Sequence, residues 1–364
     1  MTAFVTLQGI KPGNFITVDS SGNFMDSGVS SSTSSPPVTP PASSSSPSCL
    51  NVLDFGAIAD GKTDDAPAFQ AMFSQAISGG THRCYAPSAK YRLASPLQIT
   101  GSLHFYGDFS TTTLQPDVGI DGLDINTQGP VKLSDFVISY ATPATAGTQA
   151  ISVVLANTGG TTIYGNSMSV FRDIQIFNAS VGVHLANAAY FVIDRVDSYF
   201  HTSAAFICEN KNWPDAGDGV ISNCLMLGAN LQGPTGIKWT GGGAISILNN
   251  KIATHQYGIL VNLQAGANTR QMQIGWNSID GCSGAAIGFW PAGAVPNPFG
   301  GVIIANNIFN LAHIGIVAGL PPAGKWINTM IDIGNNWYGD GVAGAMYSTV
   351  PAVVNYVSAA NSTG

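Results

Sequence analysis

The sequence predicts an all-β fold, a right-handed parallel β-helix closed at its N-terminal end by one capping α-helix. Three observations predict it: a composition poor in charge and rich in glycine, a recurring β-rich unit, and one amphipathic segment ahead of the repeats. A chain that repeats a short unit with β-strands is typical of a solenoid, in which each unit packs only on its neighbours.

The composition excludes several classes of protein. Charged residues make up 9% of the 364 residues, whereas about 25% is usual in soluble proteins. Helical bundles need many Glu, Lys and Arg residues, and this chain has one glutamate, Glu209. A hydrophobic content of 45% excludes disorder over the whole chain, and a net charge of −7 argues against a nucleic-acid partner. No apolar run is long enough for a membrane span, so no membrane association is expected.

Five segments repeat one pattern, in which an asparagine follows three residues of a short strand. They read VISNCLM, ILNNKI, IGWNSI, IANNIF and IGNNWY, with the asparagine at Asn223, Asn250, Asn277, Asn307 and Asn336. The spacings are 27, 27, 30 and 29 residues. Asparagine tolerates the left-handed conformation of a tight corner and can bond to its copy in the next unit. The pattern therefore predicts an asparagine ladder along one corner of the β-helix.

The β-helix is expected to occupy residues 49–340, with its capping helix at residues 64–78. Phe69, Met72, Phe73, Ala76 and Ile77 have helical spacing and form one apolar face, and Gly79 follows the helix. Such a helix would cover the otherwise open first strands. Residues 341–364 lack the repeat pattern, and we expect them to cover the other end or to contact a neighbouring subunit.

Two further regions precede the β-helix. Residues 1–26 contain short alternating runs around a Ser-Gly-Asn turn and predict a small hairpin. Residues 27–48 hold 11 Ser and 5 Pro, which is typical of a linker. The N-terminus has no apolar run of signal-peptide length, so we expect synthesis in a cytoplasm without such a signal. The five cysteines form no CxxC pair, and no metal or other cofactor is predicted.

The segment NVLDFGAIADGKTDDAPAFQAMFSQAI, at residues 51–77, resembles the opening of the pectate-lyase-like superfamily. Asp54-Phe55-Gly56 and Asp60-Gly61-Lys62-Thr63-Asp64-Asp65 carry the match. The hairpin, the linker and the charge-poor body also resemble bacteriophage tail spikes. This resemblance implies a virion protein, a homotrimer whose residues 1–26 attach it to a phage tail or baseplate protein. It also implies that the protein acts outside the host cell, where it binds and depolymerises a bacterial capsular polysaccharide or exopolysaccharide.

Candidate catalytic residues cluster at residues 194–218, which hold five of the 20 acidic residues. Glycoside hydrolysis needs two carboxyl groups, one as acid and one as base or nucleophile. Glu209 with Asp215 or Asp218 is the predicted pair, and Asp197 is a further candidate. Trp213 and Tyr199 are expected to stack on sugars, and Lys211 or Arg195 to hold an acidic sugar. Ordinary turn and corner roles for these residues remain open.

A second group of candidates consists of residues that could line one corner of the repeats. His201 and His255 are possible bases for a lyase, and Trp276 is a possible sugar platform. Hydrogen-bonded surface histidines and subunit-contact aromatics are the alternatives. Because carboxyl groups cluster and bases do not, we favour hydrolysis over elimination. A non-catalytic receptor-binding tail protein and a bacterial pectate-lyase-type enzyme are the rival functions.

Overall fold

The structure, a computed structural model, describes most of the chain in two separate units. Its described residues are 14–18, 24–30, 49–127, 129–154, 168–209, 218–241, 243–263, 269–290, 299–318, 327–339, 345–348 and 353–363. The units are Met1–Ser46 and Pro47–Gly364. In the first unit, β1 (Asn14–Val18) and β2 (Phe24–Ser30) pair antiparallel, so a hairpin forms and its second strand runs past residue 26. Its predicted role in virion attachment stays a prediction.

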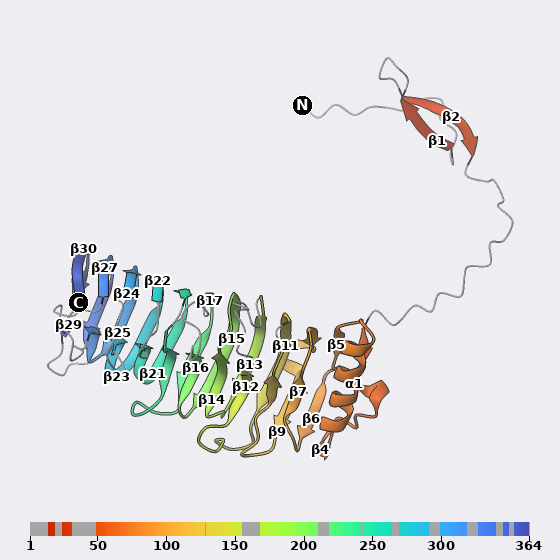
Figure 1. The fold of residues 1–364 in the computed structure, drawn as a ribbon, viewed down its shortest axis with the longest axis horizontal. Coiled ribbons are helices and arrows are strands. Elements are labelled where there is room, and N and C mark those ends of the chain that lie inside the picture. Colours follow the sequence, from red (N-terminus) through yellow and green to blue (C-terminus); the bar gives the residue numbers. More distant parts are fainter. Residues whose placement is uncertain are drawn as a thin grey trace, which may run out of the picture. The chain divides into compact units, whose positions relative to one another are not determined.

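The second unit is a solenoid of three strand columns, and all of its strand pairs among the described residues are parallel (Figure 1). The first column comprises β3 (Leu50–Asn51), β5 (Arg83–Tyr85), β8 (Leu103–Tyr106), the first parts of β11 (Val131–Ser139), β13 (Val170–Phe177) and β15 (Phe191–His201), β17 (Gly219–Ser222), β20 (Gly243–Leu248), β22 (Thr269–Gly275), β24 (Phe299–Ala305), β27 (Ile327–Ile333) and β30 (Val353–Ala359). The second comprises β4 (Asp60–Asp64), β6 (Ala89–Leu93), β9 (Thr112–Pro116), the second parts of β11, β13 and β15, β18 (Leu225–Gly228), the first parts of β21 (Lys251–Val261) and β23 (Ser278–Phe289), β25 (Ile308–Ala312), β28 (Asn336–Gly339) and β31 (Ser362–Thr363). The third comprises β7 (Leu97–Ile99), β10 (Leu123–Ile125), β12 (Gln149–Val154), β14 (Val181–Ala186), β16 (Ala204–Glu209), β19 (Thr235–Trp239), the second parts of β21 and β23, β26 (Ile314–Ala318) and β29 (Ala345–Ser348). The predicted right-handed parallel β-helix is thereby confirmed.

The core lies inside the three columns, because alternate side chains of each strand point inward. One inward row runs in register through successive coils of the first column and is fully buried: Leu133, Phe171, Ile193, Ile221, Ile247, Ile274 and Ile304. Stacking a large apolar residue, isoleucine from Ile193 onward, at one position in each coil explains why the sequence repeats at this spacing.

The helix α1 (Ala66–Ser78) covers the first coils, beside β4 to β6 in Figure 1. Phe69 is fully buried and packs edge-on against Tyr91 and Phe105, at ring distances of 5.2 and 5.8 Å. The helix begins two residues later than predicted. The Asp64 carboxylate accepts hydrogen bonds from the N–H groups of Ala66 and Ala94 and so joins the helix to β6 and its following turn. No helix among the described residues is long and apolar enough to cross a membrane.

The corner between the first and second columns contains two adjacent rows. In the outer row one residue per coil has a positive φ: Asp135, Asp173, Arg195, Asn223, Asn249, Trp276, Asn306, Gly334 and Ala360. In the inner row the amides of Asn250, Asn277, Asn307 and Asn335 bond in series, with nitrogen–oxygen distances of 2.8 to 3.0 Å. The predicted ladder therefore exists, with Asn361 as a further member whose side-chain oxygen accepts the Asn335 N–H.

Two of the predicted ladder positions are wrong by one residue. Asn223 lies in the outer row, and Cys224 occupies the inner position, where its N–H donates to Asn250. Asn335 rather than Asn336 belongs to the ladder. At the C-terminal end, β29, β30 and β31 pair in parallel with β26, β27 and β28 and continue the coil pattern. End covering, subunit contact and the homotrimer stay predictions.

Candidate functional site

The residues predicted from the 194–218 cluster are distributed over different faces of the β-helix. Asp197 and Tyr199 lie on the second column, within β15. The Asp197 carboxylate accepts hydrogen bonds from the Leu225 N–H and the Tyr199 hydroxyl. Tyr199 stacks on Phe177 with its ring 4.8 Å away, and burial is the main cause that raises its pKa. Both residues therefore have partners within the coil stack.

Glu209 ends β16 on the third column, where its side chain is 13% exposed. Its Oε2 lies 3.5 Å from Nε2 of His184, on the preceding coil. The other ring nitrogen of His184 is 2.9 Å from Oε1 of Gln149, one coil further back. The side chain of His184 thus connects Glu209 to the polar outer surface of this column, a contact that no sequence motif had indicated.

Asp218 immediately precedes β17 of the first column. Its carboxylate accepts a hydrogen bond from the Ala244 N–H on the next coil, and its carbonyl accepts one from Phe191 on the coil before. Asp218 and Glu209 flank residues 210–217. Lys211, Trp213 and Asp215 belong to that segment and lie outside the described residues. Glu209 thus ends a strand of the third column and Asp218 precedes a strand of the first, on either side of residues 210–217, while Asp197 lies on the second column.

The two predicted histidines face the interior. His201 and His255 are fully buried, and their Nε2 atoms are 2.7 Å apart. The rings meet across Gly228 of the intervening coil, where a Cβ would collide with the Thr254 carbonyl oxygen and crowd the His255 ring. Burial lowers the pKa of His201 to about 3, and burial with the neighbouring His201 lowers that of His255 to about 2. Both rings are thus neutral interior groups, and their predicted role as bases for a lyase stays a prediction.

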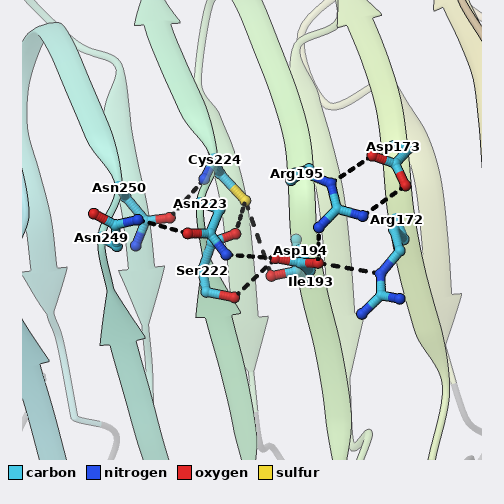
Figure 2. Close-up of polar contacts among 10 residues, drawn as sticks. All are labelled: Arg172, Asp173, Ile193, Asp194, Arg195, Ser222, Asn223, Cys224, Asn249 and Asn250. Carbon is cyan, nitrogen blue, oxygen red and sulfur yellow. Dashed lines mark hydrogen bonds and ion pairs between the residues drawn. The ribbon is translucent and has the colours of Figure 1, made fainter. Parts of the chain in front are cut away.

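Arg195 belongs to a charged network at the corner between the first and second columns (Figure 2). Its guanidinium bonds to Asp173 at 2.6 and 2.8 Å and to Asp194 at 2.7 Å. Arg172 approaches the Asp194 carboxylate from another side, at 3.1 Å. Asn223 also donates to Asp194. Burial opposes ionisation of Asp194, but the Asn223 bond and the arginine charges together lower its pKa. Arg195 is therefore committed to neighbouring carboxylates, while half of its side chain remains exposed.

Trp276 lies in the outer corner row with φ +54 and is 56% exposed. More than half of the residue is therefore accessible at the corner between the first and second columns. The position is compatible with the predicted sugar platform, and the role stays a prediction.

A groove lies on the outward face of the first column, over β20, β22, β24 and β27. It has a volume of about 340 Å³, and its lining includes Ala244, Ser246, Gln273, Ile303 and Thr329. Amide and hydroxyl groups alternate there with apolar side chains, which suits a ligand with both hydroxyl groups and apolar faces. Ala244 connects the groove to Asp218 through the hydrogen bond described above. Sequence reasoning missed this groove, because its residues lie on strands separated by about 30 positions.

Within the described ranges, no group of three or more His, Cys, Asp or Glu residues is arranged to hold a metal ion. The carboxylates of Asp218, Asp194 and Glu209 contact a backbone N–H group, arginines and His184, respectively.

Comparison with known proteins supports the fold and one sequence family. Residues 49–132 match the family "Rhamnogalacturonase A/epimerase, pectate lyase-like", which confirms the resemblance over that stretch. The mannuronan C5-epimerase AlgE1 of Azotobacter vinelandii is 42% identical over 94 residues, which cover 24% of this chain. The chain spans about 6% of the length of that curated relative.

Two solved structures of viral proteins have similar folds. The tailspike protein of E. coli bacteriophage HK620, solved as a double mutant with a pentasaccharide, aligns with a TM-score of 0.59 at 10% identity. The alignment covers 87% of this chain and 67% of that one. ORF18 of Geobacillus virus E2 aligns with a TM-score of 0.52 at 13% identity, over 85% of this chain and 61% of that one. At these identities the similarity concerns the fold alone.

Proposed function

We propose that this protein is a phage tail spike that binds a bacterial surface polysaccharide along the outward face of the first column and cleaves it. The observation that carries the proposal is the groove over β20 to β27, whose lining residue Ala244 donates its N–H to the carboxylate of Asp218. The similarity of residues 49–132 to a pectate-lyase-like family and the fold of the phage HK620 tailspike support a carbohydrate ligand.

Hydrolysis is the reaction that we favour. It requires one carboxyl group that donates a proton to the leaving oxygen and a second that activates water or attacks the sugar. Glu209, largely buried beside His184, would be the acid, and Asp218, bonded to the groove residue Ala244, the second group. Asp215 lies between them in sequence and is the reserve candidate for the second role.

The two rival functions remain a receptor-binding tail protein without catalysis and a lyase. The rivals differ from hydrolysis in their products. Hydrolysis adds one water per cleaved bond, elimination leaves an unsaturated sugar, and a receptor-binding protein releases no product.

The test uses the full chain with a panel of purified bacterial polysaccharides and mass spectrometry of the products. We expect water-added oligosaccharides from the wild type and a loss of about 10²-fold or more in cleavage rate for Glu209→Gln and Asp218→Asn. Binding of the same polymer should persist in both variants. Asp280→Asn is the matched control, because Asp280 lies on the second column.

Three results would contradict the proposal. Wild-type cleavage rates in both variants would remove Glu209 and Asp218 from the reaction. Unsaturated products would establish elimination. Binding of a polymer without any product would establish the receptor-binding function.

A further inference from the structure

A row of basic side chains lies on the outward face of the first column, near the α1 end of the β-helix. Arg83 of β5, His104 of β8 and Lys132 of β11 occupy the same register position on three successive coils. Arg83 and Lys132 are exposed and His104 is half-buried, while the alternate residues Cys84, Phe105 and Leu133 are fully buried. The three side chains of this basic strip therefore point outward, one per coil, about 4.8 Å apart.

The cations of the basic strip are not neutralised by the fold. Within the part of the chain that the structure describes, neither Arg83 nor Lys132 forms an ion pair, whereas Arg92, Arg172 and Arg195 each contact an aspartate. Burial, with the charges of Lys132 and Arg83, lowers the pKa of His104. The charge of the strip near pH 7 is therefore that of Arg83 and Lys132.

Two acidic residues, Asp108 and Asp135, lie near the strip. Asp108 accepts hydrogen bonds from the Tyr85 hydroxyl and the Ser88 N–H. Asp135 occupies the outer corner row, where its charge acts on both His104 and Arg195. Arg83 and Lys132 thus lie two coils apart on one face and form no ion pair among the described residues, in a chain with 13 basic and 20 acidic residues. Packing of the core does not require this arrangement, because both side chains point outward.

Aromatic rings border the basic strip. Tyr85 and Tyr106 stand on adjacent coils with ring centroids 5.3 Å apart, and the Arg83 guanidinium lies 5.7 Å from the centre of the Tyr106 ring. The His104 ring is 5.2 Å from the same tyrosine. Half-buried rings beside cations offer an apolar surface and charge to one ligand, which suits an anionic sugar better than a free inorganic ion.

We propose that the basic strip of Arg83, His104 and Lys132, with Tyr85 and Tyr106, is a second glycan-binding site that takes the anionic groups of the bacterial surface polysaccharide. The proposal rests on the proposed function in its choice of ligand. The strip and the groove share the outward face of the first column. Four coil steps, or about 20 Å, separate β11 from β20, so one extended polymer can contact both. The anion is a carboxylate or a phosphate.

The test measures polysaccharide binding rather than cleavage, on the full chain. Wild type and Arg83→Gln/Lys132→Gln are titrated with a uronate-containing, a phosphate-containing and a neutral polysaccharide at 50 and 200 mM NaCl. We expect the wild type to bind at least one anionic polymer. The double variant should bind that polymer at least tenfold more weakly at 50 mM NaCl and with a smaller dependence on salt. The anionic polymer whose affinity falls identifies the anion.

The matched control is Lys90→Gln/Lys251→Gln, which removes the same charge from exposed lysines of the second column. It should change affinity less than twofold, and circular dichroism checks that both doubles fold. Equal weakening by the two doubles, equal weakening for the neutral polymer, or no binding of any anionic polymer by the wild type would overturn the proposal. Salt-sensitive binding through the strip without cleavage would leave this inference standing while the proposed reaction fails.

Discussion

The corner between the first and second columns is stabilised in two different ways along the β-helix. In the coils of β13 and β15, an outer network of Asp173, Arg195, Asp194 and Arg172 connects neighbouring coils. From Asn250 onward, an inner ladder of amides takes over. Figure 2 shows the outer network and Asn250, the first member of the ladder. It also shows Asn223 of the outer row, which contacts Asp194 on one side and Asn249, of the same row, on the other.

The difference shows that burial favours neutral polar groups in the ladder and that exposure to water permits charged groups in the outer network. The ladder lies inside the coil stack, where Asn277 and Asn307 are at most 1% exposed. An amide there satisfies its donors and acceptor without carrying a charge that burial would penalise. The ionic network lies outside, with Arg172 and Arg195 about half exposed, so water solvates the part of each charge that the partner does not.

Breaking the ladder should have the largest effect on stability. Asn277→Ala removes the bonds that its side chain forms with the Asn250 N–H and amide, the Ile247 carbonyl and the Asn307 oxygen. The Asn250 amide keeps its bond to the Ile221 carbonyl, and the Asn307 oxygen keeps the Asn277 N–H. At about 1–3 kcal/mol for each buried group left unsatisfied, we expect a loss of roughly 3–5 kcal/mol in denaturant unfolding. Asn306→Gly, in the outer row with φ +55, should cost less than about 1 kcal/mol. Equal losses in the two variants would contradict the distinction between the rows.

The buried histidine pair should make stability depend on pH, whereas the buried asparagine ladder should not, because imidazole titrates and the amide does not. The folded-state pKa values of His201 and His255, about 3 and about 2, lie below the unfolded value of 6.5. The unfolded state therefore binds protons first, and stability falls as the pH drops below 6.5. We expect a loss of about 2 kcal/mol from the pair between pH 6.5 and 5.5. His201→Gln/His255→Gln should lack this component, so an unchanged slope of unfolding free energy against pH would refute it.

Removing one charge of the outer network should have the smallest effect. Asp194 is 5% exposed and accepts bonds from Asn223, Ser222 and the arginines. Asp194→Asn keeps the shape and loses the charge, which should cost about 1–2 kcal/mol. The cost should shrink at 1 M NaCl, where the remaining arginine charges are screened. A loss of unfolding free energy as large as that of Asn277→Ala, or a loss that salt leaves unchanged, would contradict the distinction between the outer network and the inner ladder.

The fold was accessible from sequence because the repeat places one residue type at one position in every coil. The apolar face of α1 and the ladder members Asn250, Asn277 and Asn307 follow from spacing alone. The predicted ladder positions were wrong where the sequence pattern allows two neighbouring residues at the same position. Asn335 and Asn336 are adjacent, and Cys224 takes a ladder position that the motif assigned to its neighbour.

The candidate site was harder to predict, because neighbours in sequence turn onto different faces. Within 22 residues the chain carries Asp197 to the second column, Glu209 to the third and Asp218 to the edge of the first. Conversely, the basic strip and the groove each gather residues from strands 20 to 30 positions apart. A linear cluster of acids is thus a weak guide to a site on a solenoid.

The glycine between the two histidines limits how the length of this protein can change in evolution. Each ladder asparagine bonds only to the coils directly before and after it. A duplicated coil inserted within the ladder would therefore bring its own asparagine and form the same bonds with both neighbouring coils. His201 and His255 meet across exactly one coil, over Gly228. Gain or loss of a coil between them would leave both buried imidazoles without the hydrogen bond that joins them. Natural variants that differ by whole coils should therefore carry the insertion or deletion on the ladder side, and keep the spacing of the histidine pair.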